Sequence, residues 1–383
     1  MSWEKYKLGD IAEFSNGINF DKSAYAPGIK LIGVSNFCNR FFPDYDELDE
    51  IKEDVVRPQA LLQSGDIIFV RSNGNKELVG RCMLVEDTPM KVTYSGFCIR
   101  LRLKNTEQFN PVFFTYHFKN IHFRRAMSGT AVGANIQNLS QGRLSAYECE
   151  IPDYGTQCAI ADTLSAYDNL IENNQKQIKL LEEAAQRLYK EWFVDLRFPG
   201  YEKVEIVDGV PDGWKKVNLD IITPILTGKK DANFGTDDGA YPFFTCAQEP
   251  IKAPSYSFDC DAVILAGNGD FNVKLYRGKF EAYQRTYVFS PKEHEDLYLL
   301  YYAVKYSMRQ LFQGASGSTI KFLTKRMLVE ILVFVPTNEI KKQFNAICES
   351  YQRKIETLKS QIQFATEARD RLLPKLMSGE LEV

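Results

Sequence analysis

The chain is an internal duplication, and this feature constrains its fold more than any other. Three residues near the start recur 211 positions later, namely Trp3, Leu8 and Gly17 as Trp214, Leu219 and Gly228. DIIFVRSNGN (66–75) matches DAVILAGNGD (261–270) at an offset of 195, and from Pro152 onward the offset is 184 over about forty residues. A constant offset over such a length indicates two copies of one unit, the second with shorter loops.

The first part of each copy reads as short strands and turns. Ile67 to Val70 and Val263 to Leu265 are brief apolar runs followed by Asn-Gly, and FCIRLRL and TYVFS have strand composition. FFTYHF and LYLLYYAV are typical of short helices. The sequence therefore predicts two globular α+β domains.

The second part of each copy predicts one long helix with a heptad seam. Apolar residues alternate at spacings of four and three for about five heptads, which is typical of a coiled coil. The predicted seam residues are Ile160, Leu164, Tyr167, Ile171, Ile178, Leu181, Leu188, Tyr351, Ile355, Leu358, Ile362 and Leu372. Asn174 and Arg369 are polar exceptions. Arg197 to Gly200 should stop the first helix, and Pro374 should kink or end the second.

These parts predict a specific architecture. We expect target domains at 1–152 and 199–336, and spacer helices at 153–198 and 337–383. About forty helical residues span on the order of 60 Å. Two helices with matching seams should pack antiparallel, which would place the two domains at opposite ends of a stiff spacer with approximate twofold symmetry.

Composition narrows the class of protein. The sequence has neither an apolar signal segment near its first residue nor a run long enough for a membrane span, so we expect a cytoplasmic protein with no membrane partner. Eight cysteines and three histidines without CxxC pairs do not favour a metal site. We predict buried apolar roles for these cysteines.

The net charge of −3 conceals two basic segments in equivalent places. Residues 88–146 carry eight basic side chains against one acid, Glu107, and residues 297–329 carry five against none. Paired basic segments on a rigid spacer suit a two-part linear target, and duplex DNA is such a target. The residues predicted to contact DNA are Arg71, Asn73, Lys119, Arg124, Arg125, Arg143, Lys305, Arg309, Lys321, Lys325 and Arg326.

Several phrases resemble the specificity (S) subunits of type I restriction-modification enzymes. They are MSGTAVGANIQNLS (127–140), CEIPDYGTQCAIADTLSAYDNLIENN (149–174), EWFVDLRFPGYE (191–202), QGASGSTIKFLTKRMLVEILVFVP (313–336) and RLLPKLMSGELEV (371–383). The resemblance implies two target recognition domains, each reading one part of a bipartite, asymmetric DNA site. It also implies docking of two methyltransferase (M) subunits that use S-adenosylmethionine and of restriction (R) subunits that use ATP, with Mg on those partners.

One position departs from the family pattern. The glutamine that follows the domain-closing proline is present as Gln157, but Lys341 stands at its equivalent. Because the heptads on both sides hold, we interpret this change as drift.

The sequence lacks motifs for catalysis. It has no Pro-Pro for an adenine methyltransferase motif, no P-loop and no Gly-x-Ser-x-Gly. Pro43-Asp44 and Glu50-Ile51-Lys52 imitate a nuclease motif, but the second copy has no equivalent. We therefore predict no catalytic residues, no metal and no cofactor in this chain. Two alternatives stay open: a specificity module of another methyltransferase–nuclease architecture, and a coiled-coil scaffold that binds protein.

Overall fold

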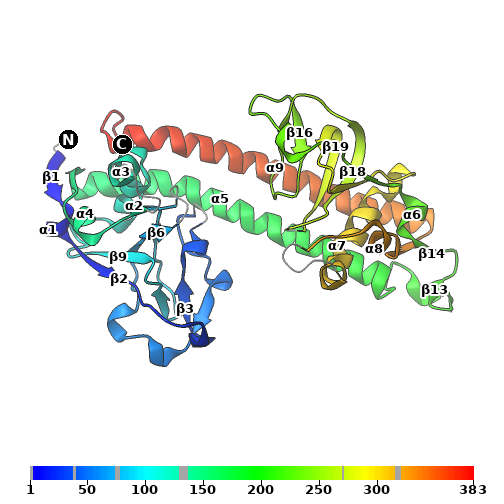
Figure 1. Cartoon of the computed structure of the whole chain (residues 1–383), viewed down its shortest axis with the longest axis horizontal. Helices are drawn as coiled ribbons and strands as arrows, with labels where there is room; N and C mark the ends of the chain where they lie inside the picture. The colour runs from blue at the N-terminus through cyan, green and yellow to red at the C-terminus, as the bar shows by residue number, and fades with distance from the viewer. Residues whose placement is uncertain (1–2, 38–39, 74–77, 129–136, 270, 315–320) are drawn as a thin grey trace. The chain divides into compact units, whose positions relative to one another are not determined.

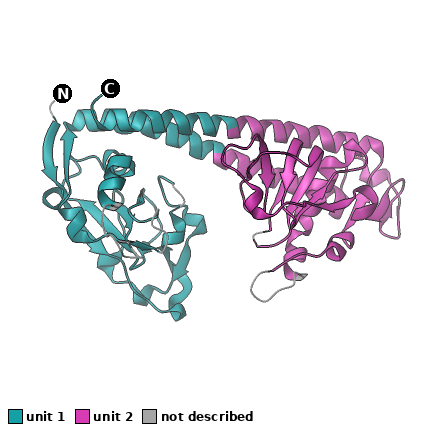
Figure 2. Ribbon diagram, turned by 45° about the horizontal axis from the view of Figure 1, so that its top comes forward, with its two compact units in different colours: residues 1–174, 360–383 teal, residues 175–359 magenta. Residues whose placement is uncertain are grey.

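The structure is a computed structural model that describes residues 3–37, 40–73, 78–128, 137–269, 271–314 and 321–383 (Figure 1). The chain divides into two compact units (Figure 2). Unit 1 comprises residues 1–174 and 360–383, and unit 2 comprises residues 175–359. Each unit therefore contains one predicted globular domain together with segments of both long helices.

Unit 1 is built around a four-stranded sheet of order β2-β9-β5-β7. Its strands are β2 (Ala12–Asn16), β9 (Cys98–Leu103), β5 (Ile67–Val70) and β7 (Cys82–Leu84). All four residues of β5 are buried, which explains its unbroken apolar sequence. The other strands are β1 (Trp3–Lys7), β3 (Tyr25–Ile32), β4 (Asp49–Ile51), β6 (Ser72–Asn73), β8 (Val92–Tyr94), β10 (Gln137–Asn138) and β11 (Glu148–Pro152). The shorter helices are α1 (Leu8–Ile11), α2 (Pro111–Lys119), α3 (Ile121–Ser128) and α4 (Gln141–Ser145).

Unit 2 contains one six-stranded sheet of order β15-β20-β18-β19-β16-β17. Its strands are β15 (Ile225–Thr227), β20 (Thr286–Phe289), β18 (Phe258–Ala266), β19 (Val273–Ala282), β16 (Tyr241–Phe244) and β17 (Ile251–Ala253). The remaining strands are β12 (Ile206–Val207), β13 (Val210–Pro211), β14 (Lys215–Asn218) and β21 (Leu332–Val335), and the shorter helices are α6 (Leu219–Ile222), α7 (Leu297–Gly314) and α8 (Lys325–Val329). The expectation of a mixed α+β fold is confirmed.

The two units repeat the same framework. In unit 1, β1 pairs antiparallel with β11, and in unit 2, β14 pairs antiparallel with β21. The Leu8 N–H donates to the Tyr147 carbonyl, just as the Leu219 N–H donates to the Ile331 carbonyl, both at 2.9 Å. These contacts reproduce the offsets of 211 and 184 read from the sequence, so the duplication extends to the backbone hydrogen bonds.

Two long helices run through both units. Helix α5 (Tyr154–Tyr189) has 36 residues and α9 (Asn338–Met377) has 40, or about 54 and 60 Å at 1.5 Å per residue. A short π-helical segment, Lys190–Val194, follows α5, so helical structure ends before Arg197 as expected. Helix α9, however, continues past Pro374 to Met377. A proline this close to the end of a helix removes only one terminal hydrogen bond, so it does not stop the helix.

Inside each unit, segments of α5 and α9 contact each other. In unit 1, Asp168 pairs with Arg369, and further along α5 the buried Asn174 donates from Nδ2 to Gln361 Oε1 at 3.2 Å. The later residue of α5 thus meets the earlier residue of α9, so the two segments run in opposite directions in this unit. The two polar exceptions in the seam, Asn174 and Arg369, both have polar partners across it.

The predicted seam residues differ in burial. Ile160, Leu164, Ile355 and Leu358 are buried. The others are half-buried, namely Tyr167, Ile171, Ile178, Leu181, Leu188, Tyr351, Ile362 and Leu372. In unit 2 the seam also uses aromatic side chains, since the ring of Trp192 lies 5.9 Å from that of Phe344 between centroids. A half-buried stripe is what two packed helices produce when solvent reaches both sides of their contact.

Gln157, the glutamine that follows the domain-closing proline, anchors the start of α2. Gln157 Oε1 accepts from the Asn110 N–H at 2.9 Å, and its Nε2 donates to the Gln108 carbonyl at 3.1 Å. In unit 2, Lys341 occupies the equivalent place and forms a buried ion pair with Asp296, directly before α7. The interpretation of Lys341 as drift is therefore wrong, because its change is matched by a carboxylate where unit 1 has Asn110.

Candidate nucleic-acid interface

In unit 1, two segments that are far apart in the sequence meet beside the end of β5. Strand β6 pairs with β10, so that Asn73 lies opposite Gln137 and Ser72 opposite Asn138. The Leu139 N–H donates to the Arg71 carbonyl at 2.9 Å. The fold thus brings together Arg71 and Asn73 with the segment that leads into α4. Gly74 and Asn75, the rest of the predicted turn, lie outside the described residues.

Unit 2 contains the same junction. Asn268 forms an antiparallel bridge with Phe322, and the Leu323 N–H donates to the Gly267 carbonyl at 2.8 Å. The Lys321 carbonyl accepts from the Gly269 N–H at 3.3 Å. Lys321 is one of the residues predicted to contact DNA, and the structure places it at this junction.

A tight turn lies against each junction and connects to the central sheet. In unit 1 the Cys98 N–H donates to the Ser95 carbonyl at 2.9 Å, and in unit 2 the Thr286 N–H donates to the Tyr283 carbonyl at 2.8 Å. Each pattern is a four-residue β-turn, placed immediately before β9 in one unit and before β20 in the other. These turns provide a common reference for aligning the two copies.

The strand register corrects the sequence alignment of the two copies by one residue. Val70 pairs with Cys98, and Ala266 pairs with Thr286, so Val70 and Ala266 are counterparts. Their offset is 196, whereas the shared Asn-Gly letters gave 195. A slip of one residue moves each side chain to the opposite face of a sheet, so hydrogen bonding decides the register.

The correction changes which residues correspond at the junction. Asn268 is the counterpart of Ser72, and Gly269 is the counterpart of Asn73. Likewise Gly267 is the counterpart of Arg71, because each accepts the N–H of the equivalent leucine. The two copies therefore present different side chains at equivalent backbone positions.

Two of the lysines predicted to contact DNA are engaged inside their own units. Lys119 donates from Nζ to the Arg40 carbonyl at 2.8 Å and lies 5.7 Å from the centroid of the Phe41 ring. Burial lowers the pKa of Lys119. Lys305 lies 5.0 Å from the centroid of the Tyr301 ring and 3.8 Å from the Glu182 carboxylate. These contacts favour a packing role, and contact with DNA stays a prediction for both lysines.

Four of the predicted residues are exposed on short helices or at helix ends. They are Arg125 on α3, Arg309 on α7, and Lys325 and Arg326 on α8. Arg326 pairs with Glu330 one turn later, at 3.1 Å. An exposed pair of this kind contributes little to stability, so the guanidinium can exchange its partner for a phosphate.

The remaining predicted residues are half-buried. Arg71 donates from Nη1 to the Gly96 carbonyl at 3.5 Å, and Arg143 donates from Nη2 to the Ala126 carbonyl at 2.8 Å. Arg124 lines a small pocket together with Arg40 and Lys119. Lys321 lies 4.0 Å from the centroid of the Phe312 ring, where the aromatic face attracts its charge.

Much of the excess positive charge of residues 88–146 is used inside unit 1. Arg102 binds the buried Asp66 through two hydrogen bonds of 2.6 and 2.7 Å. Arg100 is buried and donates to the Gln59 carbonyl, and Lys104 donates to the carbonyls of Gly9 and Asp10. The count of basic residues along the sequence therefore overstates the charge that this segment offers to a ligand.

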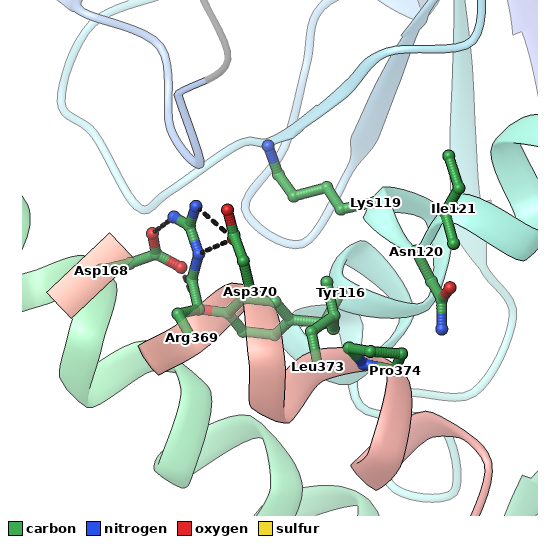
Figure 3. A pocket seen from close by; sticks show the side chains of 9 residues that line it. All are labelled: Tyr116, Lys119, Asn120, Ile121, Asp168, Arg369, Asp370, Leu373 and Pro374. Atoms are coloured by element: carbon green, nitrogen blue, oxygen red, sulfur yellow. Dashed lines mark hydrogen bonds and ion pairs between the residues drawn. The ribbon is translucent and has the colours of Figure 1, made fainter. Parts of the chain in front are cut away.

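A pocket of about 270 Å³ lies in unit 1 between α2 and the two long helices (Figure 3). On its wall, Tyr116 donates to Asp168 Oδ2 at 2.5 Å, and Arg369 pairs with the other carboxylate oxygen. Asp370 binds the outer side of the same guanidinium at 2.8 Å. Burial and the nearby Asp168 raise the pKa of Tyr116. This network fixes α2 to α5 and α9. The heptad pattern identified Arg369 only as a polar exception in the seam and did not reveal this role.

The described residues contain no cluster of three or more histidine, cysteine or acidic side chains that could hold a metal. None of the helices in the described part combines the length and the apolar character needed to cross a membrane.

The fold is shared with a solved structure, and the sequence is similar to known proteins. The crystal structure of a type I restriction-modification S subunit from M. genitalium superposes with a TM-score of 0.60 at 18% identity, covering 98% of this chain and 96% of that one. A putative type I restriction enzyme MjaX specificity subunit of Methanocaldococcus jannaschii is 25% identical over an alignment of 412 positions, covering 100% of this chain and 94% of that subunit.

A higher identity occurs over a shorter span. The type I restriction enzyme EcoDI specificity subunit of Escherichia coli is 38% identical over 168 residues, which are 44% of this chain and 36% of that subunit. The family model described as "Type I restriction modification DNA specificity domain" matches residues 1–183 and 211–365, so it covers both copies of the repeat. The chain belongs to the family of type I restriction-modification DNA specificity domains.

Proposed function

We propose that this chain is the DNA-reading subunit of a type I restriction-modification system. It would recognise a bipartite and asymmetric site, with each unit reading one half. The observation that carries this proposal is the duplicated junction, where identical backbone hydrogen bonds hold different side chains in the two units. A common framework with different reading residues suits two different half-sites on one duplex.

The long helices would set the gap between the half-sites. Helices α5 and α9 each contribute residues to both units. We further propose that the two helices pair as an antiparallel coiled coil along their length. In unit 1 the contacting segments of α5 and α9 run antiparallel, as the hydrogen bond between Asn174 and Gln361 illustrates, and this supports the pairing.

The chain itself would carry out no chemistry. Two methyltransferase subunits would dock on it and supply S-adenosylmethionine, and restriction subunits would supply the ATP- and Mg-dependent steps. The absence of methyltransferase, P-loop and hydrolase motifs from the sequence supports this division of labour. In this scheme the DNA contacts of the present chain choose the site, and the partners modify or cut it.

The proposal is tested by co-expressing the chain with a type I methyltransferase (M) subunit that co-purifies with it, in a host that lacks adenine methylation. We expect one bipartite methylated motif in the genome of that host, and none when either protein is omitted. A stable complex without any methylated motif would contradict the proposal.

Salt dependence separates DNA reading from a protein scaffold. The affinity of the purified complex for duplex DNA should fall steeply as salt rises, because phosphate contacts release counterions. A flat response would instead favour the scaffold. A chain that assembles only with a fused methyltransferase–nuclease would favour the other architecture.

A further inference from the structure

Each tight turn beside a junction has an exposed side chain at its third position, Phe97 in unit 1 and Arg285 in unit 2, and in unit 2 the neighbouring Gln284 is exposed as well. The Phe97 carbonyl accepts the Arg71 N–H at 2.8 Å, and the Arg285 carbonyl accepts the Gly267 N–H at 2.9 Å. Phe97 and Arg285 are therefore structural counterparts, each at the third position of its β-turn. Neither residue was identified from the sequence, because the two turns have no identical residues at equivalent positions.

A glycine of the repeat, Gly17 in unit 1 and Gly228 in unit 2, lies directly against the backbone of each turn. A Cβ at Gly17 would lie 2.1 Å from the carbonyl oxygen of Ser95, and a Cβ at Gly228 would lie 2.5 Å from the carbonyl oxygen of Tyr283, the first residues of the two turns. No side chain fits at such distances. The backbone that follows β2 in unit 1 and β15 in unit 2 therefore packs directly on the turn. A side chain carried by a turn fixed in this way has a defined direction, which reading a base edge requires.

The two exposed side chains differ in chemistry, although their backbones are equivalent. Phe97 is 62% exposed, which is a large apolar surface for a residue on a rigid turn. Arg285 is exposed, and among the described residues none forms an ion pair or a hydrogen bond with its guanidinium. Contacts within the two units therefore do not explain why phenylalanine and arginine occupy these positions.

The position of the arginine differs between the two copies. Unit 1 has Arg71 at the end of β5, and its guanidinium reaches the Gly96 carbonyl beside Phe97. Unit 2 has Gly267 at the equivalent place, where a Cβ would lie 2.4 Å from the Arg285 carbonyl oxygen. The second unit thus lacks an arginine on the strand and has one on the turn.

We propose that Arg285 and Phe97 are specificity-determining residues, Arg285 selecting a guanine and Phe97 a thymine in their respective half-sites. Arginine can donate two hydrogen bonds to O6 and N7 of guanine in the major groove, and an aromatic side chain can contact the C5 methyl group of thymine. This assignment rests on the proposed function, because it needs each unit to face one half-site.

The test begins with the methylated motif of the wild-type complex and continues with binding to duplexes that carry single base-pair changes. The wild type should discriminate about ten- to hundredfold against loss of one G·C pair in one half-site. In Arg285→Ala this discrimination should fall below about threefold at that position alone, while the other half-site and the gap stay unchanged. Phe97→Ala should relax one T·A position in the opposite half-site by a smaller factor.

Matched controls are available on other elements of the same units. Arg197→Ala removes an exposed arginine of unit 2, and Tyr25→Ala removes an exposed aromatic of unit 1, and both should leave the motif unchanged. Arg285→Lys keeps the charge but not the two-pronged geometry, so it should retain affinity while losing most of the preference for guanine.

The outcomes that would overturn the assignment are distinct from failure of the proposed function. If Arg285→Ala weakens binding to all duplexes equally and leaves the motif intact, Arg285 contacts phosphate and the assignment is overturned. An unchanged motif at unchanged affinity also overturns it. If the wild-type complex methylates no bipartite motif at all, the proposed function itself fails, and the assignment fails with it.

Discussion

Lys341 Nζ lies 2.5 Å from Asp296 Oδ1, and both side chains are almost completely buried at the start of α7. In unit 1 the equivalent site holds Gln157, whose amide satisfies the backbone at the start of α2. The same connection between a long helix and a recognition domain is thus made once with neutral groups and once with charges. Since a buried charge is tolerated only with its partner, the two residues must change together.

We predict that Lys341→Met destabilises unit 2 by about 3 kcal/mol, because it leaves the Asp296 carboxylate buried without a counter-charge. The double variant Lys341→Gln with Asp296→Asn should recover most of this loss, since it copies the neutral chemistry of unit 1. Urea-induced unfolding of the wild type, Lys341→Gln, Asp296→Asn and the double variant measures the coupling between the two residues. Strictly additive effects would contradict the pairing.

We predict that Asp168→Asn lowers the free energy of unfolding by about 2 kcal/mol, because Arg369 loses a charged partner that is largely shielded from solvent. Asp370→Asn is the matched control: Asp370 binds the same guanidinium from an exposed position, and its loss should cost less than about 1 kcal/mol. Equal effects in thermal unfolding would mean that burial does not distinguish the two carboxylates.

Unit 1 should lose stability as the pH falls from about 6.5 to about 4, because burial lowers the pKa of His117 to about 4. Above pH 6.5 His117 is neutral in both the folded and the unfolded chain, so it has no effect there. Between these values only the unfolded chain takes up the proton, which favours unfolding. Below about pH 4 the folded form is protonated too, and the loss reaches its limit.

The contribution of His117 is isolated by difference. His117→Phe retains an aromatic ring among Phe113, Phe118 and Tyr147, and it should flatten the pH dependence of urea unfolding between pH 6.5 and 4. The exposed His122 is the control, and His122→Phe should keep the wild-type slope. A wild-type slope in His117→Phe would show that the buried imidazole is not the group responsible.

If the long helices set the spacing of the half-sites, removing one heptad from each of α5 and α9 should shorten the recognised gap. Seven residues correspond to about 10 Å of helix, or about three base pairs of B-DNA. Both half-sites should stay the same, because the recognition domains are untouched. Methylation profiling measures gap and half-sites together, and altered half-sites with an unchanged gap would contradict this role. A same-length replacement of the two heptads that preserves the seam should leave the motif as in the wild type.

Pattern in the sequence was sufficient for the features that repeat. The offsets of 211 and 184 identified the duplication, and the heptad spacing identified both long helices, because periodicity reflects which face of an element is buried. Short apolar runs such as Ile67–Val70 predicted strands for the same reason. These features depend on local periodicity, which a single chain displays without any knowledge of its contacts.

The tertiary structure decided what depends on contacts between distant segments. The structural alignment of β18 with β5 differs by one residue from the alignment based on identical residues. Hydrogen bonds between strands, and not residue identities, fix this register. Lys119 was counted as a surface cation, yet its ammonium is held by the Arg40 carbonyl. Phe97 and Arg285 share no local pattern and became counterparts only through the backbone that supports them. Periodicity along a chain reports burial of a face, whereas the position of one side chain depends on partners that the fold brings together.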